Sequence, residues 1–282
     1  RTIVENMAII YREGARYFDK EIVVVGALRH CVRMVTYGDP TIRGIAASTL
    51  AILSNNPDIV LQMFSYGAIA PILKISGLDS SEPEMLAGLG CLVQLVRIPQ
   101  IAIRVVGQGA VSILEGALHL MHSRTPGVAN SVRSKALLSF AWLSKVPQVR
   151  HLISGPNVFR GMERELLNGK PNDQTMVLQM MINFRLNHSE HQNKYKKVVF
   201  DKVLFLMKDG LWFSRNLTTK CLCLIYITPD EKIYAAQNGA LESIFNLIES
   251  KSLDLQEIPL VALLSFCTHP EIPFIILEKG YH

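Results

Sequence analysis

Blocks of apolar residues recur along this chain at a spacing of about forty residues, and polar turns separate them. The clearest block begins at Pro57, where an apolar segment leads to Gly67. A second apolar segment, 69–75, ends at a polar turn, and a longer one, 85–96, leads to Pro99. Proline suits the first turn of a helix, and glycine after a helix end takes positive φ without a Cβ clash. The block therefore predicts three consecutive helices, which is the content of one helical solenoid repeat.

The same two markers recur along the rest of the sequence. Prolines open blocks at Pro57, Pro99, Pro147, Pro229 and Pro270, and Ser189 stands in the remaining slot. Glycines close the first helix of a block at Gly26, Gly67, Gly109, Gly155, Gly239 and Gly280. The spacing predicts six repeats, at about 16–56, 57–98, 99–146, 147–188, 189–228 and 229–269. Partial units at 1–25 and 270–282 are expected to cap the two ends of a single domain, 1–282.

The residues after the glycines carry a resemblance to a known family. Gly67, Gly109 and Gly239 are each followed by alanine and an aliphatic residue, and the longer third segment of the first repeat ends in Leu-Ser-Asn-Asn at 53–56. In these features the chain resembles armadillo-repeat proteins over residues 17–281. The resemblance implies an all-α, right-handed superhelical solenoid whose third helices line a concave groove. It also implies a scaffold or adaptor that binds other proteins and has no enzymatic activity.

Composition narrows the class of protein further. Apolar residues make up 49% and aromatic residues 7% of the chain, a balance that suits packing of aliphatic helices. Unbroken apolar runs such as 260–264 are far shorter than the ~20 residues that span a bilayer. A net charge of +5 is too small and too dispersed to indicate a nucleic-acid partner. Five scattered cysteines indicate reduced, mostly buried thiols and a cytoplasmic location.

Motifs for catalysis are missing from the sequence. His119 and His122, like His188 and His191, have a spacing that can hold a metal ion on a helix, but no further ligands accompany them. Cys221 and Cys223 are expected to be buried thiols, because they point in different directions on a helix. There is no phosphate-binding loop and no nucleophile motif. We therefore predict no catalytic residue, no metal and no cofactor.

The expected groove differs from that of peptide-carrying relatives. In armadillo proteins that hold extended peptides, an asparagine recurs on each third helix. The positions six residues before the proline markers are Ala51, Val93, Ala141, Asn183, Cys223 and Leu264. The neighbouring register contains Ile52, Gln94, Trp142, Phe184, Leu224 and Ser265. Only Asn183 matches, so the groove is expected to take helical or apolar segments. A soluble peptide carrier of the nuclear-import or catenin kind is the alternative, and it would hold a basic peptide at Gln179 and Asn183.

Several side chains are candidates for partner contact. Arg43, Arg133 and Arg215 share one register near the start of a third helix, either as a basic surface for acidic partner residues or as contacts to the previous repeat. Trp142 is either a core residue or part of the groove. A peripheral patch is formed by Lys194, Lys196, Lys197 and, in a predicted turn between helices, Trp212. The lysines form either a solvated face or a surface for acidic partners or anionic lipid.

A narrower resemblance concerns the architecture as a whole. A chain built from armadillo repeats from end to end resembles a family of apicomplexan proteins that consist of such repeats only. The resemblance implies a place on the cytosolic face of rhoptries, which these proteins position at the apical end by recruiting a myosin motor and other partners. It further implies membrane attachment only through an acylated Gly-Cys leader, which the sequence does not contain.

Overall fold

The computed structural model describes residues 26–123, 125–184, 196–225, 228–249 and 256–280, and all regular structure in these ranges is helical. The chain divides into two compact units, Arg1–Gly161 and Met162–His282, which are described separately here. Helix α11 (Pro156–Asn168) contains the boundary. The expected single domain, 1–282, therefore stays a prediction.

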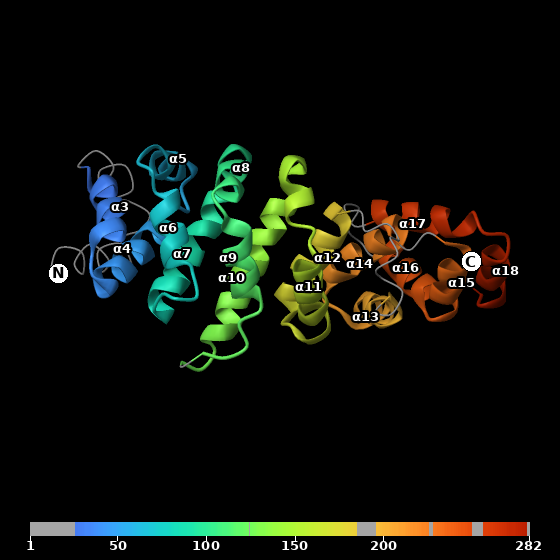
Figure 1. Cartoon of the computed structure of the whole chain (residues 1–282). Helices are drawn as coiled ribbons and strands as arrows, with labels where there is room; N and C mark the ends of the chain where they lie inside the picture. The colour runs from blue at the N-terminus through green and yellow to red at the C-terminus, as the bar shows by residue number, and fades with distance from the viewer. Residues whose placement is uncertain (1–25, 124, 185–195, 226–227, 250–255, 281–282) are drawn as a thin grey trace. The chain divides into compact units, whose positions relative to one another are not determined.

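Unit 1 is built from helices in groups that follow the predicted blocks (Figure 1). After α3 (Ala27–Tyr37) and α4 (Pro40–Leu53) come two groups of three. They are α5 (Pro57–Ser65), α6 (Ile69–Ile75) and α7 (Glu82–Leu95), then α8 (Pro99–Gly107), α9 (Ala110–Leu118) and α10 (Val128–Ser144). A short 3-10 helix, Pro147–Leu152, precedes α11. We call α4, α7 and α10 the third helices of this unit.

Local sequence explains where the third helices begin. Asp39 precedes Pro40 and caps α4 by accepting a hydrogen bond from the Ile42 backbone N–H at 3.0 Å. Ser81 and Glu84 form a capping box at the start of α7, so two backbone donors that the helix leaves unpaired gain partners. Such caps fix the starts of α4 and α7.

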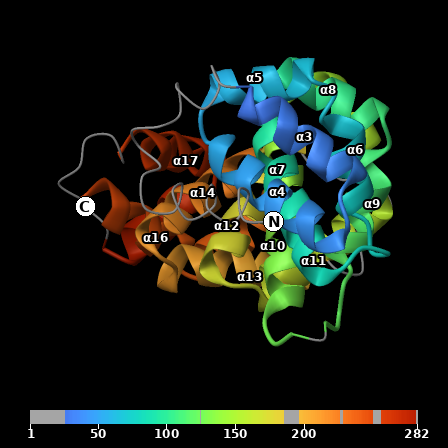
Figure 2. The same cartoon turned by 90° about the vertical axis from the view of Figure 1, so that its left-hand side faces the viewer.

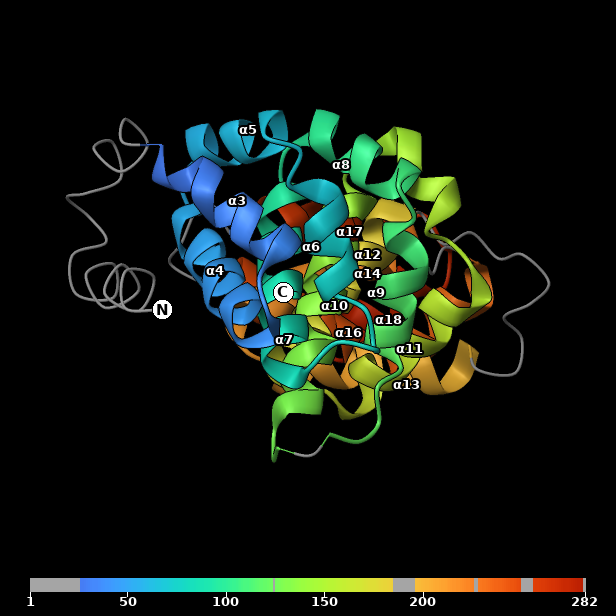
Figure 3. The same cartoon turned by 60° about the vertical axis from the view of Figure 1, so that its left-hand side comes forward.

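The third helices pack against each other in sequence order. Helix α7 contacts both α4 and α10, and each third helix also contacts a preceding helix, as in the pairs α3–α4, α6–α7 and α9–α10. The position seven residues before the proline marker is fully buried in each case, as Leu50, Leu92 and Phe140. The first helices α5 and α8 lie side by side away from this core (Figures 2 and 3). The same position of the third helix is therefore buried in each of these repeats.

Unit 2 shows the same pattern of contacts. Its helices are α12 (Pro171–Phe184), α13 (Lys196–Asp209), α14 (Trp212–Leu224), α15 (Pro229–Gln237), α16 (Ala240–Ile248), α17 (Glu257–Cys267) and α18 (Ile272–Glu278). The third helices here are α12, α14 and α17, and α14 contacts both of the others. Leu222 occupies the buried position seven before the marker and is 1% exposed.

The predicted glycine turns are confirmed at all but one site. Gly26, Gly67, Gly109, Gly239 and Gly280 have φ between 71° and 93°, the left-handed region that favours glycine. Gly155 is the exception, since it is not among the positive-φ glycines. The reason is that the preceding helix is a short 3-10 segment and Pro156, rather than a glycine turn, opens α11.

Other expectations have mixed outcomes. The turn predicted at Trp212 is wrong, because this residue begins α14. Cys31, Cys91 and Cys221 are buried as expected, but Cys267 is exposed. The predicted cap, 1–25, and the opening of the repeat at 189 lie outside the described residues. No single described helix is long and apolar enough to cross a bilayer, although three sharply bent helix pairs meet the length and composition criteria together.

Candidate functional site

One register of the third helices reaches solvent in both units. The residues five before each proline marker, here called the third-helix row, are half-buried or exposed: Ile52, Gln94 and Trp142 in unit 1, and Phe184, Leu224 and Ser265 in unit 2. In unit 1 the following residues, Leu53, Leu95 and Leu143, are no more than 2% exposed. Val93 and Ala141, one position earlier, are each 6% exposed. On α7 and α10 the row is thus the outward edge of an otherwise buried helix face.

A cleft of about 360 Å³ lies in unit 1 beside Trp142, between the ends of α7 and α10 and the start of the 3-10 helix. Its apolar walls are formed by Val96, Pro99, Val146 and Pro147. Its remaining lining residues are Arg97, Trp142, Lys145 and Gln148. We call this the Trp142 cleft. It combines an aromatic ring, apolar walls and two cations in one small space.

The two cations of the cleft both lie over the Trp142 ring. The Lys145 Nζ atom is 3.9 Å from the ring centre, and the Arg97 guanidinium carbon is 5.4 Å from it. Arg97 Nη1 also donates a hydrogen bond to Gln94 Oε1 at 2.8 Å, and Gln94 Nε2 donates to Asn55 Oδ1 at 3.1 Å. Both cations are exposed, and cation–π contacts at exposed sites stabilise by about 0.5–1 kcal/mol. The groups that hold the two charges are neutral.

The three arginines in a common register have a structural role that repeats. Arg43 Nη1 donates to the Gly38 carbonyl at 3.2 Å, Arg133 Nη1 to the Leu120 carbonyl at 2.8 Å, and Arg215 Nε to the Gly210 carbonyl at 2.9 Å. Each acceptor lies in the connection that precedes the arginine's own third helix. The arginines therefore fasten these connections, and their role as a basic partner surface stays a prediction.

The remaining predicted site residues lie in different places. Gln179 and Asn183 both lie on α12 and are half-buried, and Gln179 Nε2 donates to Asn183 Oδ1 at 3.1 Å. Lys196 and Lys197 begin α13, while Lys194 lies outside the described residues. The structure thus links Gln94 to Trp142 through Arg97, and it pairs Gln179 with Asn183. Contact of these residues with a partner stays a prediction.

Arg97 and Lys145 were not predicted from the sequence to be site residues. Each lies two residues before a proline marker, the same position that Asn55 occupies in the first repeat. Their positions in short connections after the third helices gave no helical pattern from which to judge their direction. A comparison of the repeats at this one register could have identified both.

Neither metal binding at His119 nor thiol reactivity at Cys91 is indicated. No group of three or more His, Cys, Asp or Glu side chains in this part of the chain could hold a metal ion. His119 Nε2 lies 2.9 Å from the Asn157 carbonyl oxygen, which gives it a structural partner. Burial raises the pKa of the Cys91 thiol to about 12, so this buried thiol stays protonated and unreactive.

Comparison with known proteins identifies the fold. No model of a protein family matches the sequence, and no curated protein matches it. Among solved structures, a designed armadillo repeat protein, YIII(Dq)4CqI, is 15% identical with a TM-score of 0.69, covering 85% of this chain and 99% of that one. An engineered protein is 16% identical with a TM-score of 0.75, covering 98% of this chain and 67% of that one.

A third solved structure contains a bound peptide. The designed armadillo repeat protein YIII(Dq.V1)4CPAF, in complex with the peptide (KR)4, is 16% identical with a TM-score of 0.64, covering 85% of this chain and 99% of that chain. Structural similarity at this low sequence identity shows a shared fold. The chain therefore has the all-α armadillo-repeat solenoid fold.

Proposed function

We propose that the protein is a non-enzymatic scaffold or adaptor that binds segments of other proteins on its third helices. The third-helix row carries this proposal. Ile52 and Leu224 occupy this same register on their own third helices and are 38% and 43% exposed. Four of the six residues in the row are aliphatic or aromatic, which suits a surface that apolar or helical partner segments cover.

Similarity in fold to a peptide-bound design supports a peptide-binding role for the chain. The ligand in that design's complex is (KR)4, a basic peptide. In unit 1 of this chain, Arg97 and Lys145 lie beside Trp142, so a basic peptide would meet like charges there. This counts against the alternative of a carrier for basic peptides in unit 1. In unit 2 the alternative depends on Asn183, whose amide is already paired with Gln179.

A random-peptide display selection tests the scaffold function. We expect the purified protein to select binding peptides whose affinity falls in Ile52→Asp and Leu224→Asp variants. The matched controls are Leu61→Asp and Ile103→Asp, because these aliphatic residues are 48% and 40% exposed but lie on first helices. Binding that is lost in the first-helix variants and kept in the third-helix variants would contradict the proposed surface.

A more specific proposal concerns the location and role of the protein in the cell. We propose that the protein acts on the cytosolic face of rhoptries and helps to position them by recruiting a myosin motor and other partners. Its support is the resemblance in architecture to apicomplexan proteins made of armadillo repeats only. The test is to express the tagged chain behind an acylated leader in such a parasite. Rhoptry localisation and recovery of a myosin motor support the proposal, whereas nuclear localisation with recovery of import cargo would favour the carrier.

A further inference from the structure

We propose that the Trp142 cleft binds a short acidic segment of a partner protein. In this arrangement an apolar side chain of the partner lies against Trp142, and its carboxylates lie at Arg97 and Lys145. The inference rests on the scaffold function proposed above and adds the chemistry of the partner at one defined site.

Charge is the first argument for an acidic partner. The residues that line the cleft include two cations and no acidic side chain. Among the described residues, no carboxylate forms an ion pair with Arg97 or Lys145, although ion pairs form elsewhere, as between Arg43 and Glu84. Two uncompensated positive charges at one small opening attract carboxylates and repel basic segments.

The second argument is that the cations are held before a partner arrives. Arg97 is fixed by Gln94, which is in turn hydrogen-bonded to Asn55, and the Lys145 ammonium lies over the Trp142 ring. Groups held in their binding positions lose less conformational entropy on association. A guanidinium has five N–H donors, so the bond to Gln94 leaves Arg97 donors that can meet a carboxylate.

The third argument concerns the apolar walls. Val96 and Val146 are buried, whereas Pro99 and Pro147 are exposed and the Trp142 indole ring is half-buried. A volume of about 360 Å³ has room for a few side chains. A segment that alternates apolar and acidic residues uses the ring, the walls and the two charges together, whereas a highly charged lipid headgroup uses only the charges.

The probe is a short labelled peptide that alternates leucine and glutamate, and fluorescence anisotropy measures its affinity for the full chain. The matched peptides carry glutamine or lysine in place of every glutamate. We expect binding of the acidic peptide that weakens by about tenfold or more with glutamine and that falls as salt is added. The lysine peptide is expected to bind more weakly than the glutamine peptide, because its charges oppose Arg97 and Lys145.

Variants locate the bound peptide. Reversing both charges in Arg97→Glu/Lys145→Glu should lower the affinity by about tenfold or more, because two attractions become repulsions. The control Arg104→Glu reverses an exposed charge on α8, a first helix of the same unit, and should change the affinity by less than about twofold. Circular dichroism melting confirms that each variant is folded.

Three results would overturn the inference. The first is equal binding of the glutamate and glutamine peptides, and the second is an equal loss in the Arg104→Glu control. The third is binding to phosphatidylserine–phosphatidylcholine vesicles through Arg97 and Lys145 without binding of the acidic peptide. If library-selected peptides of another composition still depend on Ile52 and Leu224, the scaffold function stands and only the acidic specificity fails.

Discussion

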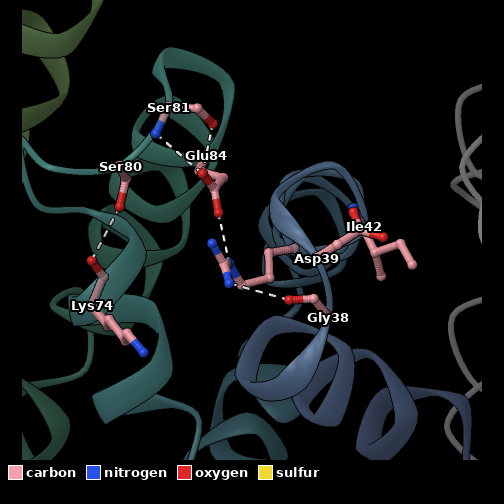
Figure 4. A network of polar contacts seen from close by, with 8 residues as sticks. Gly38, Asp39, Ile42, Lys74, Ser80, Ser81 and Glu84 are labelled. Carbon is pink, nitrogen blue, oxygen red and sulfur yellow. Dashed lines mark hydrogen bonds and ion pairs between the residues drawn. The ribbon is translucent and has the colours of Figure 1, made fainter.

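The guanidinium Nε of Arg43 lies 2.7 Å from the carboxylate Oε1 of Glu84, and this ion pair joins α4 to α7 (Figure 4). The Glu84 side chain is only 2% exposed, and it also accepts hydrogen bonds from the backbone N–H and hydroxyl of Ser81. One carboxylate therefore caps its own helix and binds the preceding repeat. This couples the start of one third helix to the position of its neighbour.

The first prediction is that Arg43→Met lowers the free energy of unfolding by about 2 kcal/mol, because the buried carboxylate loses its cationic partner. Urea unfolding followed by circular dichroism measures it. The control Asp79→Asn removes an exposed acid in the same unit and should change stability by less than about 0.5 kcal/mol. Equal effects of the two substitutions would show that the ion pair contributes nothing.

The second prediction is a pH dependence with a definite sign. Burial alone would raise the pKa of Glu84, but hydrogen bonds from Ser81 and Arg43 outweigh it and hold the pKa below the ordinary value of 4.5. The resulting stability is fully present above the unfolded-state pKa and is lost as the pH falls through the folded-state pKa. Melting temperatures below pH 4.5 should thus fall more steeply for the wild type than for Arg43→Met. Parallel curves would contradict this.

The third prediction compares two glycines near the end of α8. Gly109 has φ of 90°, whereas Gly107 belongs to the helix, and a Cβ at either would meet no heavy atom within 4 Å. Gly109→Ala should cost about 1–2 kcal/mol, because an L-residue is strained in left-handed backbone. Gly107→Ala should stabilise by about 0.5–1 kcal/mol through helix propensity. Thermal melting measures both, and shifts of the same sign would disprove the turn.

The fourth prediction concerns Gly88, where α6 approaches α7. A Cβ at this position would lie 2.5 Å from Ser76 Oγ and 2.9 Å from Ile75 Cγ1. Gly88→Ala should therefore cost about 1–3 kcal/mol by overpacking. Gly90→Ala is the control, because its Cβ would lie 3.3 Å from the Ala51 methyl group, and its melting temperature should fall less. A larger fall in melting temperature for Gly90→Ala than for Gly88→Ala would contradict the close approach of α6 to Gly88.

The fifth prediction separates the cysteines by reactivity. Burial raises the pKa of the Cys31 thiol to about 11 and that of the Cys91 thiol to about 12, whereas Cys267 is exposed. At neutral pH, a thiol-specific chromogenic reagent should modify Cys267 quickly and the other two only as fast as the protein unfolds. The Cys267→Ser variant should lose the fast phase. Fast modification of Cys91 in the native protein would contradict its buried position.

Much of the fold was predictable because its markers act locally. Pro57 and Pro99 begin first helices, and Gly67 and Gly109 form turns. Each of these structures depends mainly on residues close by in the sequence. The direction of Trp142 was not predictable, because a shift of one residue rotates a helical side chain by about 100°. Arg97 could not be placed beside Trp142 either, since the two residues meet only when successive repeats stack. Gly155 was misassigned because the first helix of its block is a short 3-10 helix and Pro156 begins the next helix.

The most direct test of the proposed binding surface is to observe the Trp142 indole itself. The chain has two tryptophans, so a nitrogen-15 spectrum of the indole N–H groups can be assigned with a single Trp142→Phe variant. We predict that a peptide selected from the random library shifts the Trp142 indole resonance as it saturates the protein. A Trp142 resonance that stays unchanged at saturation would contradict the claim that partners bind along the third helices at this cleft.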